Sequence, residues 1–381
     1  MLQILPKAFV AQTEAGSQIA RTISTPTSTK VAAATFMTIL ACVCLAFLAF
    51  SESLAVAPGE SADQDDDTQL AAEAKREAKR PANEIDPKFI AKVMAAYASD
   101  PTKNRELGVF LSHIVQSSVD ADDYERALAP AKVLIDHDDA DPQIYNLAGI
   151  AAFSTNDFDA AETYLKTADK KGALQGMGKR YLPHLDKYRA MWRREQELRD
   201  AEADADDLPR VLLKTNRGDI VVELFENEAP NTVANFISLV EKKFYDGVRF
   251  HRVLAAFMAQ GGDPDGNGSG GPGYRIRCEC TLPEHRLHFG GSLSMAKTAA
   301  PDTGGSQFFL MFRPSGPAAG YNLDGKHTVF GRVVEGLDLL AKIQRIDPEA
   351  PRPGVKADKI VAAKVLRKRD HEYVPETLPI R

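Results

Sequence analysis

The 381-residue chain has few cysteines and no excess of positive charge. Of its four cysteines, Cys42 and Cys44 lie in an uncharged apolar run, which leaves Cys278 and Cys280 for the rest of the chain. A disulfide framework is therefore excluded as the source of stability. The net charge is −6, from 47 basic and 53 acidic residues, and the basic run KVLRKRD alternates like a strand with a solvated face. This charge pattern argues against nucleic-acid binding.

Two site motifs are also incomplete. The run GGDPDGNGSGGPG at 261–273 is rich in glycine, but no Gly-Lys-Ser/Thr ending and no helical pattern follow it. A phosphate-binding loop is therefore excluded. The segment CECTLPEHRLH holds Cys278, Cys280, His285 and His288, but Cys-x-Cys is not one of the usual zinc spacings. No metal is predicted there; a zinc site and a reversible thiol pair are the alternatives to an ordinary strand and loop.

Charge is absent from residues 31–50, a run of twenty residues that is long enough to cross a bilayer. Basic residues dominate before it and acidic residues after it, which favours a cytoplasmic segment at 1–30 and export of the rest. We expect residues 31–50 to be a transmembrane signal anchor that holds extracytoplasmic C-terminal domains at the membrane in a single pass. The alternatives are a signal peptide that is cleaved near Ala55, which gives a secreted protein, and a buried globular helix.

The rest of the chain divides where its pattern changes. Residues 51–84 are rich in Asp, Glu, Ala and Lys without apolar periodicity, which predicts a disordered, charged tether, with a short charged helix at its end as the alternative. Residues 85–201 carry apolar side chains at helical spacing, and 202–208 read as an acidic hinge. From 209 to 369 the period changes to short strand-like runs with many glycines, and 370–381 form a C-terminal tail.

A repeat is visible within 85–201. Gly149 and Ala161 lie where two helices joined by the turn STNDF would cross, and Ala127 lies 34 residues before Ala161 in a comparable segment. A 34-residue period of helix–turn–helix units resembles the tetratricopeptide repeat, although the earlier unit has Val115 in place of Gly149. We expect an all-α repeat domain that binds a protein partner or acts as a spacer. An unrelated helical bundle is the alternative.

The C-terminal region has its own local signals. VLLKTNRGDIVVELF predicts a β-hairpin, and APNTVANFISLVEKKFYDG predicts an amphipathic helix capped by Asn231 or Thr232. KIVAAKVLRKR predicts a final strand. We therefore expect a mostly β unit with at least one helix, for which a closed barrel is the natural architecture.

Three stretches carry the candidate chemistry: RFHRVLAAFMAQGGD, SLSMAKTAAPDTGGSQFFLMF and YNLDGKHTVFGRVVEGLDLL. The first reads as a strand that leads into a sharp glycine turn, with a cation and an amide among apolar residues. In this order and spacing, FHRV, FMxQGGD, GSQFF and LDGKHTVFG resemble the cyclophilin family of peptidyl-prolyl cis-trans isomerases. The resemblance covers residues 209–369, under half of the chain.

The resemblance implies a closed eight-stranded barrel flanked by two helices, and catalysis without a cofactor or a metal. The expected fold class is therefore multidomain, with a transmembrane helix, an all-α repeat domain and this mostly β barrel. We predict an enzyme that rotates X-Pro bonds in proline-containing polypeptides and assists the folding of exported or membrane-associated proteins. The alternative is a proline-peptide-binding scaffold with incidental isomerase activity, whose partner is chosen by the helical repeats.

The chemistry suggests a role for each polar residue. An X-Pro bond rotates slowly because amide resonance raises the barrier. Arg252 is always charged, and its N–H groups can stabilise the lone pair of a pyramidal prolyl nitrogen. Gln260 is expected to hold Arg252 and the substrate backbone, and the resemblance places His251 near the site, where a structural role is the alternative. The predicted substrate-binding residues are Phe257, Met258, Ala296, Lys297, Gln307, Phe309, Leu323 and His327.

The sequence departs from the family pattern at two positions. Lys297 stands where family members often carry Asn, but that position mostly binds through its backbone, so activity is expected to survive. Asn322 stands where many members carry Trp directly before Leu-Asp-Gly. That Trp helps to grip cyclosporin, so weak inhibition by cyclosporin is expected.

Overall fold

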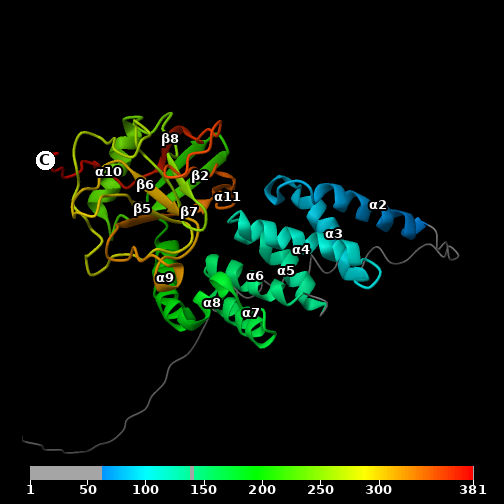
Figure 1. Ribbon diagram of the computed structural model, residues 1–381. Helices are drawn as coiled ribbons and strands as arrows, with labels where there is room; N and C mark the ends of the chain where they lie inside the picture. The colour runs from blue at the N-terminus through cyan, green and yellow to red at the C-terminus, as the bar shows by residue number, and fades with distance from the viewer. Residues whose placement is uncertain (1–61, 138–140, 381) are drawn as a thin grey trace, which may run out of the picture. The chain divides into compact units, whose positions relative to one another are not determined.

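The computed structural model describes residues 62–137 and 141–380 (Figure 1). The predicted cytoplasmic segment at 1–30 and the predicted anchor at 31–50 lie outside the described residues. Within the described ranges, no helix is both long enough and apolar enough to cross a membrane. The transmembrane helix of the expected fold class therefore has no counterpart among the described helices.

The N-terminal half of the described chain is helical, as predicted. Asp86 and Asp141 each begin a helix, because each carboxylate accepts a backbone N–H of the first turn and a proline follows directly. The helices are α2 (Ala62–Glu77), α3 (Pro87–Ser99), α4 (Arg105–Asp120), α5 (Tyr124–Asp136), α6 (Pro142–Ser154), α7 (Phe158–Lys170), α8 (Gly176–Tyr181) and α9 (Leu185–Ala205), with 3-10 turns η1 (Ala82–Glu84) and η2 (Leu182–His184).

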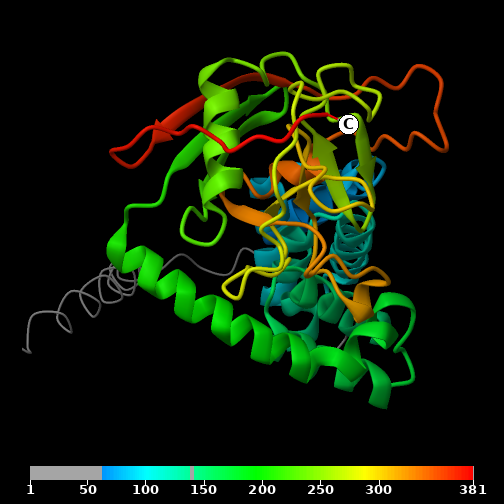
Figure 2. The ribbon, with the colours of Figure 1, turned by 90° about the vertical axis from the view of Figure 1, so that its left-hand side faces the viewer.

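Two stretches that were predicted as tether and hinge are helical in the structure. α2 falls within the predicted tether, and its Leu70 and Ala74 are buried in the core. α9, seen along its length in Figure 2, continues to Ala205 and so takes up much of the predicted hinge. Its Glu195 and Glu202 are ion-paired with Arg286, so the acidic composition reflects pairing within the protein rather than a solvated linker.

The helices α4 to α7 form two hairpins with matching turns. Asp122 in the first turn has φ +62°, and Asn156, which follows it by 34 residues, has φ +68° in the second. Each turn is closed by the same hydrogen bond of 2.8 Å, from Asp123 N to Ser118 O and from Asp157 N to Ala152 O. The period seen in the sequence is therefore present in the backbone conformation.

The C-terminal half forms one antiparallel eight-stranded sheet in the order β3-β4-β6-β5-β7-β2-β1-β8. Its strands are β1 (Arg210–Thr215), β2 (Gly218–Leu224), β3 (Arg252–Leu254), β4 (Met258–Gly261), β5 (Ser292–Met295), β6 (Phe308–Met311), β7 (Val329–Glu335) and β8 (Ile360–Arg367).

The sheet is an open half-barrel, so the expected closed barrel is wrong. Among the described residues, its edge strands β3 and β8 share no ladder, and only an isolated bridge from Arg249 to Lys359 and three backbone hydrogen bonds join residues 247–250 to 358–360. The strand β3 is only three residues long, and the residues before it meet the start of β8 by these few contacts instead of by a ladder.

The predicted hairpin and amphipathic helix are confirmed as β1–β2 and α10 (Pro230–Glu241), and a second short helix, α11 (Leu339–Lys342), follows β7. The predicted cap of α10 is wrong. Ala229 occupies the N-cap position, and the distant Glu279 carboxylate accepts the backbone N–H groups of Asn231 at 2.9 Å and Thr232 at 2.8 Å. A carboxylate at a helix N-terminus is favourable, but nothing local in the sequence identifies it.

Alternation along β3, β4 and β6 separates two apolar clusters. Val253, Ala259 and Leu310 pair across these strands and face the main core, against which α10 also packs. Their neighbours Met258 and Met311 face the opposite way and belong to a smaller cluster. Because successive side chains of a strand point to opposite faces, this second cluster is presented away from the core.

The main core continues from the sheet into the helices through aromatic side chains. Phe158 and Trp192 both lie against Phe289, with ring centroids 6.5 and 4.8 Å apart. Phe153 extends the same cluster by stacking on Tyr181 at 3.8 Å. The helices and the sheet therefore share one apolar core.

Candidate active site

A row of paired residues crosses the edge of the sheet. Arg252 of β3 lies opposite Gln260 of β4, Gln260 lies opposite Phe309 of β6, and Phe309 lies opposite Ser294 of β5. Directly opposed residues on neighbouring antiparallel strands project to the same face. The ladder therefore brings a cation, an amide and an aromatic ring from distant parts of the chain into one row.

A small apolar cluster lies beside this row, and we call it the pocket because half of its side chains remain partly exposed. Its buried residues are Met258, Ala296, Phe309 and Met311, and the partly buried Leu254, Phe257, Tyr321 and Leu323 pack against them. The rings of Phe257 and Tyr321 are 4.2 Å apart between centroids. This cluster is small, half-open and separate from the main core, which suits it to hold an apolar ring.

Arg252 is placed at the border of the pocket with its charge available. Its guanidinium carbon lies 5.7 Å from the centroid of Phe257, within the range of a cation–π contact. Among the described residues, no hydrogen bond and no ion pair occupies its N–H donors. A fixed cation with unoccupied planar donors can bind a polar group of a ligand in the pocket.

Gln260 is held by Gln307 rather than by Arg252. Its amide donates to Gln307 Oε1 at 3.0 Å, and Gln307 in turn donates to the carbonyls of Gly268 at 3.0 Å and Gly270 at 2.9 Å. The expected hydrogen bond between Gln260 and Arg252 is not present in the described structure. The two glutamines instead connect the row to the glycine-rich segment that follows β4.

His327 closes the pocket beside Phe309, with ring centroids 5.5 Å apart and nearly perpendicular planes. Its Nδ1 lies 3.0 Å from the carbonyl oxygen of Met295, so Nδ1 carries the proton and Nε2 can only accept. Burial lowers the pKa of His327 below its usual value and outweighs this hydrogen bond. The imidazole is therefore neutral at pH 7.

A groove of about 730 Å³ leads away from the pocket. Four predicted site residues line it, namely Gln260, Ala296, Lys297 and Gln307. Lys297 turns its ammonium group to its own loop, 3.1 Å from the carbonyl of Thr298. The opposite part of the groove is formed by the glycine-rich residues 268–273 and by Ile380 of the C-terminal tail. A groove of this form can hold an extended peptide whose ring-bearing residue enters the pocket.

Comparison with known proteins connects this geometry to a family. The model of the family "Cyclophilin type peptidyl-prolyl cis-trans isomerase/CLD" matches residues 210–365. A peptidyl-prolyl cis-trans isomerase of Helicobacter pylori is 51% identical over 137 residues, which are 35% of this chain and 80% of that protein. The chain belongs to the cyclophilin family.

Two further proteins of this kind are similar to part of the chain. Peptidyl-prolyl cis-trans isomerase B of Bacillus subtilis is 48% identical over 128 residues, which are 34% of this chain and 85% of that protein. A crystal structure of a cyclophilin-type isomerase of Cryptosporidium parvum has 30% identity and a TM-score of 0.37, and the match covers 42% of this chain and 99% of that one. The predicted resemblance and the prediction of an isomerase enzyme are confirmed for the cyclophilin domain, and the family match does not extend to the helices α2 to α9.

The glycine loop of the cyclophilin domain, residues 262–273, is organised by a buried carboxylate. Asp263 is fully buried and accepts the backbone N–H groups of Asp265, Asn267 and Gly268 at 2.8, 3.0 and 2.5 Å. Burial alone would raise the pKa of Asp263, but these N–H donors outweigh it and hold the pKa below its usual value. Gly262 begins the loop with φ +85°, where a Cβ atom would collide with the carbonyl of Ser306.

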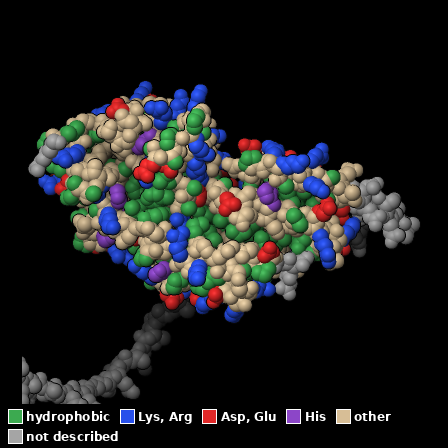
Figure 3. Space-filling model, in the orientation of Figure 1, with side chains coloured by type: hydrophobic (Ala, Val, Ile, Leu, Met, Phe, Trp, Pro, Cys, Tyr) green, Lys and Arg blue, Asp and Glu red, His purple; other side chains and the backbone are tan. Residues whose placement is uncertain are grey.

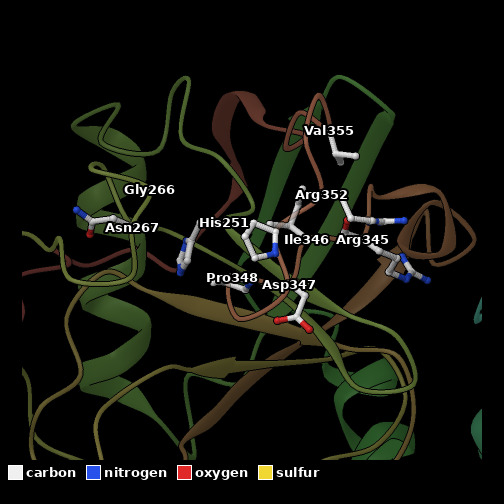
Figure 4. A pocket seen from close by; sticks show the side chains of 10 residues that line it. His251, Gly266, Asn267, Arg345, Ile346, Asp347, Pro348, Arg352 and Val355 are labelled. Carbon is white, nitrogen blue, oxygen red and sulfur yellow. The ribbon is translucent and has the colours of Figure 1, made fainter.

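His251 is not brought to the pocket. Its neighbour Arg252 belongs to the row, but His251 lines a separate cavity of about 170 Å³ together with Ile346, Pro348 and Arg352 (Figure 4). It is 8% exposed, and burial lowers its pKa. No other predicted site residue lines that cavity, so the structure places His251 outside the site.

Sequence reasoning missed three residues that build the site. Tyr321 directly precedes Asn322 and has no predicted role, yet it packs on Phe257 and its hydroxyl donates to the carbonyl of Ala256 at 3.2 Å. Met311 was missed although it follows Phe309 at the spacing of two that puts both on one face. Ile380 has no signal in the sequence, because the tail is held beside the groove by distant residues such as Arg275, which pairs with Leu378.

The residues of the alternative metal interpretation have separate roles. Cys278 and Cys280 are free thiols on either side of Glu279, which caps α10. The Cys278 sulfur accepts the backbone N–H of Asp302 at 3.2 Å. His288 pairs with Asp324 at 2.8 Å and stacks beside Phe309. In the described ranges, no group of three or more His, Cys, Asp or Glu side chains is arranged to hold a metal ion.

Proposed function

We propose that the cyclophilin domain catalyses rotation about X-Pro bonds of polypeptides that lie in the groove. The observation that supports this most strongly is the unoccupied guanidinium of Arg252 at the border of a small apolar pocket. The barrier to rotation comes from conjugation of the prolyl nitrogen with the carbonyl, so a catalyst must favour the state in which this conjugation is lost.

In this proposal the pocket binds the proline ring, and the guanidinium of Arg252 stabilises the twisted amide. Met258, Phe309 and Leu323 would hold the proline ring by apolar contact. As the amide twists, its nitrogen becomes pyramidal and gains a localised lone pair, which an N–H of Arg252 can then bind. This interaction is stronger in the twisted state than in the planar ground state, which is the condition for catalysis. No covalent bond forms or breaks.

The groove would hold the chain on either side of the rotating bond. Gln260, Ala296 and Gln307 line it and offer amide and backbone groups to an extended peptide. His327 closes the pocket as a neutral wall, because its proton is used on Met295. With one end fixed in the groove and the ring fixed in the pocket, rotation about the bond between them is the motion that remains.

We further propose that the helical domain resembles the tetratricopeptide repeat and selects a protein partner or client. The support is the 34-residue offset of its two hairpin turns and the close fit of Gly149 against Leu165, where a Cβ atom would not fit. On the face in Figure 3, basic and acidic side chains are interspersed, which suits a protein partner more than a nucleic acid. Exported or membrane-associated clients remain a prediction from residues 31–50.

The experiment is proline isomerisation of a short Ala-Pro peptide by the full chain, with Arg252→Ala beside Arg277→Ala. Loss of Arg252 should lower kcat by roughly 10²–10³-fold, the usual cost of removing one stabilising donor. Arg277 is an exposed arginine outside the pocket and the groove, so its replacement serves as the matched control. A folded wild-type chain that binds the peptide without accelerating rotation would support the scaffold alternative instead.

A further inference from the structure

The tight turn between β3 and β4, residues 254–257, carries Phe257 into the pocket and follows directly on Arg252. We call it the pocket turn. Its third residue, Ala256, has φ +54°, a conformation that favours glycine. Both backbone polar groups of Ala256 are bound, and their partners come from outside the turn. The conformation of Ala256, which directly precedes Phe257, therefore depends on those partners.

The N–H partner comes from the helical domain. Ala256 N donates to Asp122 Oδ1 at 2.7 Å, although Asp122 lies 134 residues earlier in the chain. The carboxylate is 7% exposed and is itself held: Oδ1 also accepts from Tyr124 Oη at 2.9 Å, and Oδ2 accepts from Arg345 Nη2 at 2.8 Å. Asp122 thus offers a fixed acceptor to the turn.

The carbonyl partner is supported by the helices as well. Ala256 O accepts from Arg313 Nε and from the hydroxyl of Tyr321. Arg313 is buried, and its Nη1 donates to the hydroxyl of Tyr181 in α8. Tyr181 is fully buried, with its ring stacked on Phe153. The N–H and the carbonyl of Ala256 are therefore both hydrogen-bonded, one directly to Asp122 of the helical domain and the other to Arg313, which is itself bound to Tyr181 of that domain.

We propose that Asp122 and Tyr181 are positioning residues of the isomerase, through which the helical domain fixes the pocket turn. They touch no substrate in this proposal. They hold Ala256 in its strained conformation, so that Phe257 faces Tyr321 and Arg252 stays at the border of the pocket. The inference rests on the proposed function and adds to it that the helices form part of the machinery that shapes the pocket.

The repeat supplies a matched control for Asp122. Asn156 occupies the equivalent turn of the second hairpin with nearly the same φ, and it also binds the cyclophilin domain. Its Oδ1 accepts the N–H of Gly290 at 3.1 Å, and its Nδ2 donates to the carbonyl of Gly290 at 3.5 Å. Gly290 belongs to neither the pocket nor the groove. Loss of this side chain removes a similar domain contact without touching the pocket turn.

The experiment uses the full chain with Asp122→Gly, Asp122→Asn and Asn156→Gly. Glycine is chosen because both positions have positive φ, where alanine would add strain of its own. Asn keeps an oxygen that can accept from Ala256 N but loses the ion pair with Arg345. If Asp122 only held the domains together through its ion pair, Asp122→Asn and Asp122→Gly would lose the same activity. If Asp122 positions the turn, Asp122→Asn should keep the activity that Asp122→Gly loses.

The readouts are kcat and KM on the Ala-Pro peptide, the unfolding temperature, and the fluorescence of Trp192. Trp192 is the single tryptophan of the chain and lies 4.8 Å from Phe289, so it reports whether α9 stays docked on the cyclophilin domain. Asp122→Gly should lower kcat/KM about tenfold, mainly through kcat, with Trp192 emission unchanged. Asp122→Asn and Asn156→Gly should stay within about twofold of wild type, because the hydrogen bond to the turn is kept.

Wild-type activity in Asp122→Gly, or an equal loss in Asp122→Asn, would overturn the proposal. A shift of the Trp192 emission in Asp122→Gly would mean that the docking of α9 has changed as well. Tyr181→Phe is then the variant that tests the proposal, because it keeps the stacked ring and removes the hydroxyl bound by Arg313. A loss of about threefold or more supports the proposal there, since one buried hydrogen bond is removed, and unchanged activity overturns it. An inactive wild-type chain would instead count against the proposed function, which keeps the two failures distinct.

Discussion

The pocket turn and the glycine loop lie on two sides of the candidate site, and a buried aspartate holds each of them by backbone N–H groups. Asp263 belongs to the loop that it holds and accepts three N–H groups within five residues of itself. Asp122 belongs to a different domain and accepts one backbone N–H, from Ala256. The same hydrogen-bonding device is therefore local on one side of the site and long-range on the other.

The difference has consequences for control of the site. A loop that is held by its own aspartate keeps its shape whatever the helices do. A turn that is held from the helical domain changes when those helices move, so a partner bound to them could alter the pocket without altering the groove. The comparison predicts that the two sides respond to different substitutions, and the following tests go from the largest expected effect to the smallest.

Asp263→Ala should give the largest effect, because it leaves three backbone N–H groups of the glycine loop without their acceptor. We expect the free energy of unfolding to fall by roughly 3–5 kcal/mol, as for removal of a buried charged partner. Urea denaturation measures this loss, with the exposed Asp265→Ala in the same loop as control. In Asp263→Ala, the Ala256 amide should exchange hydrogen no faster by local opening than in the wild type. Faster local exchange would show that the pocket turn also depends on Asp263, which would contradict the comparison.

Phe257→Ala tests the pocket turn from within. The variant removes the ring that packs on Tyr321 and lies under Arg252, while the backbone contacts of Ala256 remain. We expect kcat/KM to fall about tenfold, mainly through KM, because apolar contact with the proline ring is lost. Leu282→Ala, an exposed apolar residue outside the pocket, is the control. A loss confined to kcat would instead show that the ring acts by orienting Arg252.

The local side of the comparison is also the side that the sequence predicts better. The paired glycines and Asp263 mark a turn whose atoms are neighbours in the chain, and the row that joins Arg252 to Phe309 follows from strand alternation once the motifs are placed. The hairpin β1–β2 and helix α10 were predictable for the same reason, since both depend on turns and periodicity over a dozen residues.

What the sequence could not predict depends on contacts between distant segments. Three such contacts join residues that are more than 45 positions apart. They are the Glu279 cap of α10, the hydrogen bond from Ala256 N to Asp122, and the approach of Ile380 to the groove. The open sheet was missed because the apolar pattern does not show that β3 is only three residues long. His251 precedes β3 and lines another cavity, so its proximity to Arg252 in the sequence does not bring its side chain to the pocket.

Ile380→Ala tests the far end of the glycine-loop side. The tail is fixed by hydrogen bonds of 2.9 and 2.7 Å between Arg275 and Leu378, which leaves Ile380 at the groove although it is 64% exposed. Because little apolar area is buried there, we expect a change of only about threefold in preference among peptides that differ two or three residues before the proline. Val374→Ala, which is exposed in the same tail but away from the groove, is the control. An equal change in both variants would exclude a specific role for Ile380.

The smallest effect concerns pH and involves a residue that neither aspartate holds. Burial lowers the pKa of His327 below the usual 6.5, so the unfolded chain takes up its proton first as the pH falls. Bound protons then favour the unfolded state, and His327 contributes to a loss of stability that begins as the pH drops through about 6.5. His327→Gln should flatten the slope of the unfolding free energy against pH between about pH 7 and 5.5, where the protonation of carboxylates changes little.

His251→Gln is the control. His251 is also buried with a lowered pKa, so its replacement should flatten the slope too, but without the change in KM that a pocket residue should show. A steeper slope in His327→Gln would mean that the folded pocket binds the proton more tightly than the unfolded chain, and the neutral wall assigned to this residue would then be wrong.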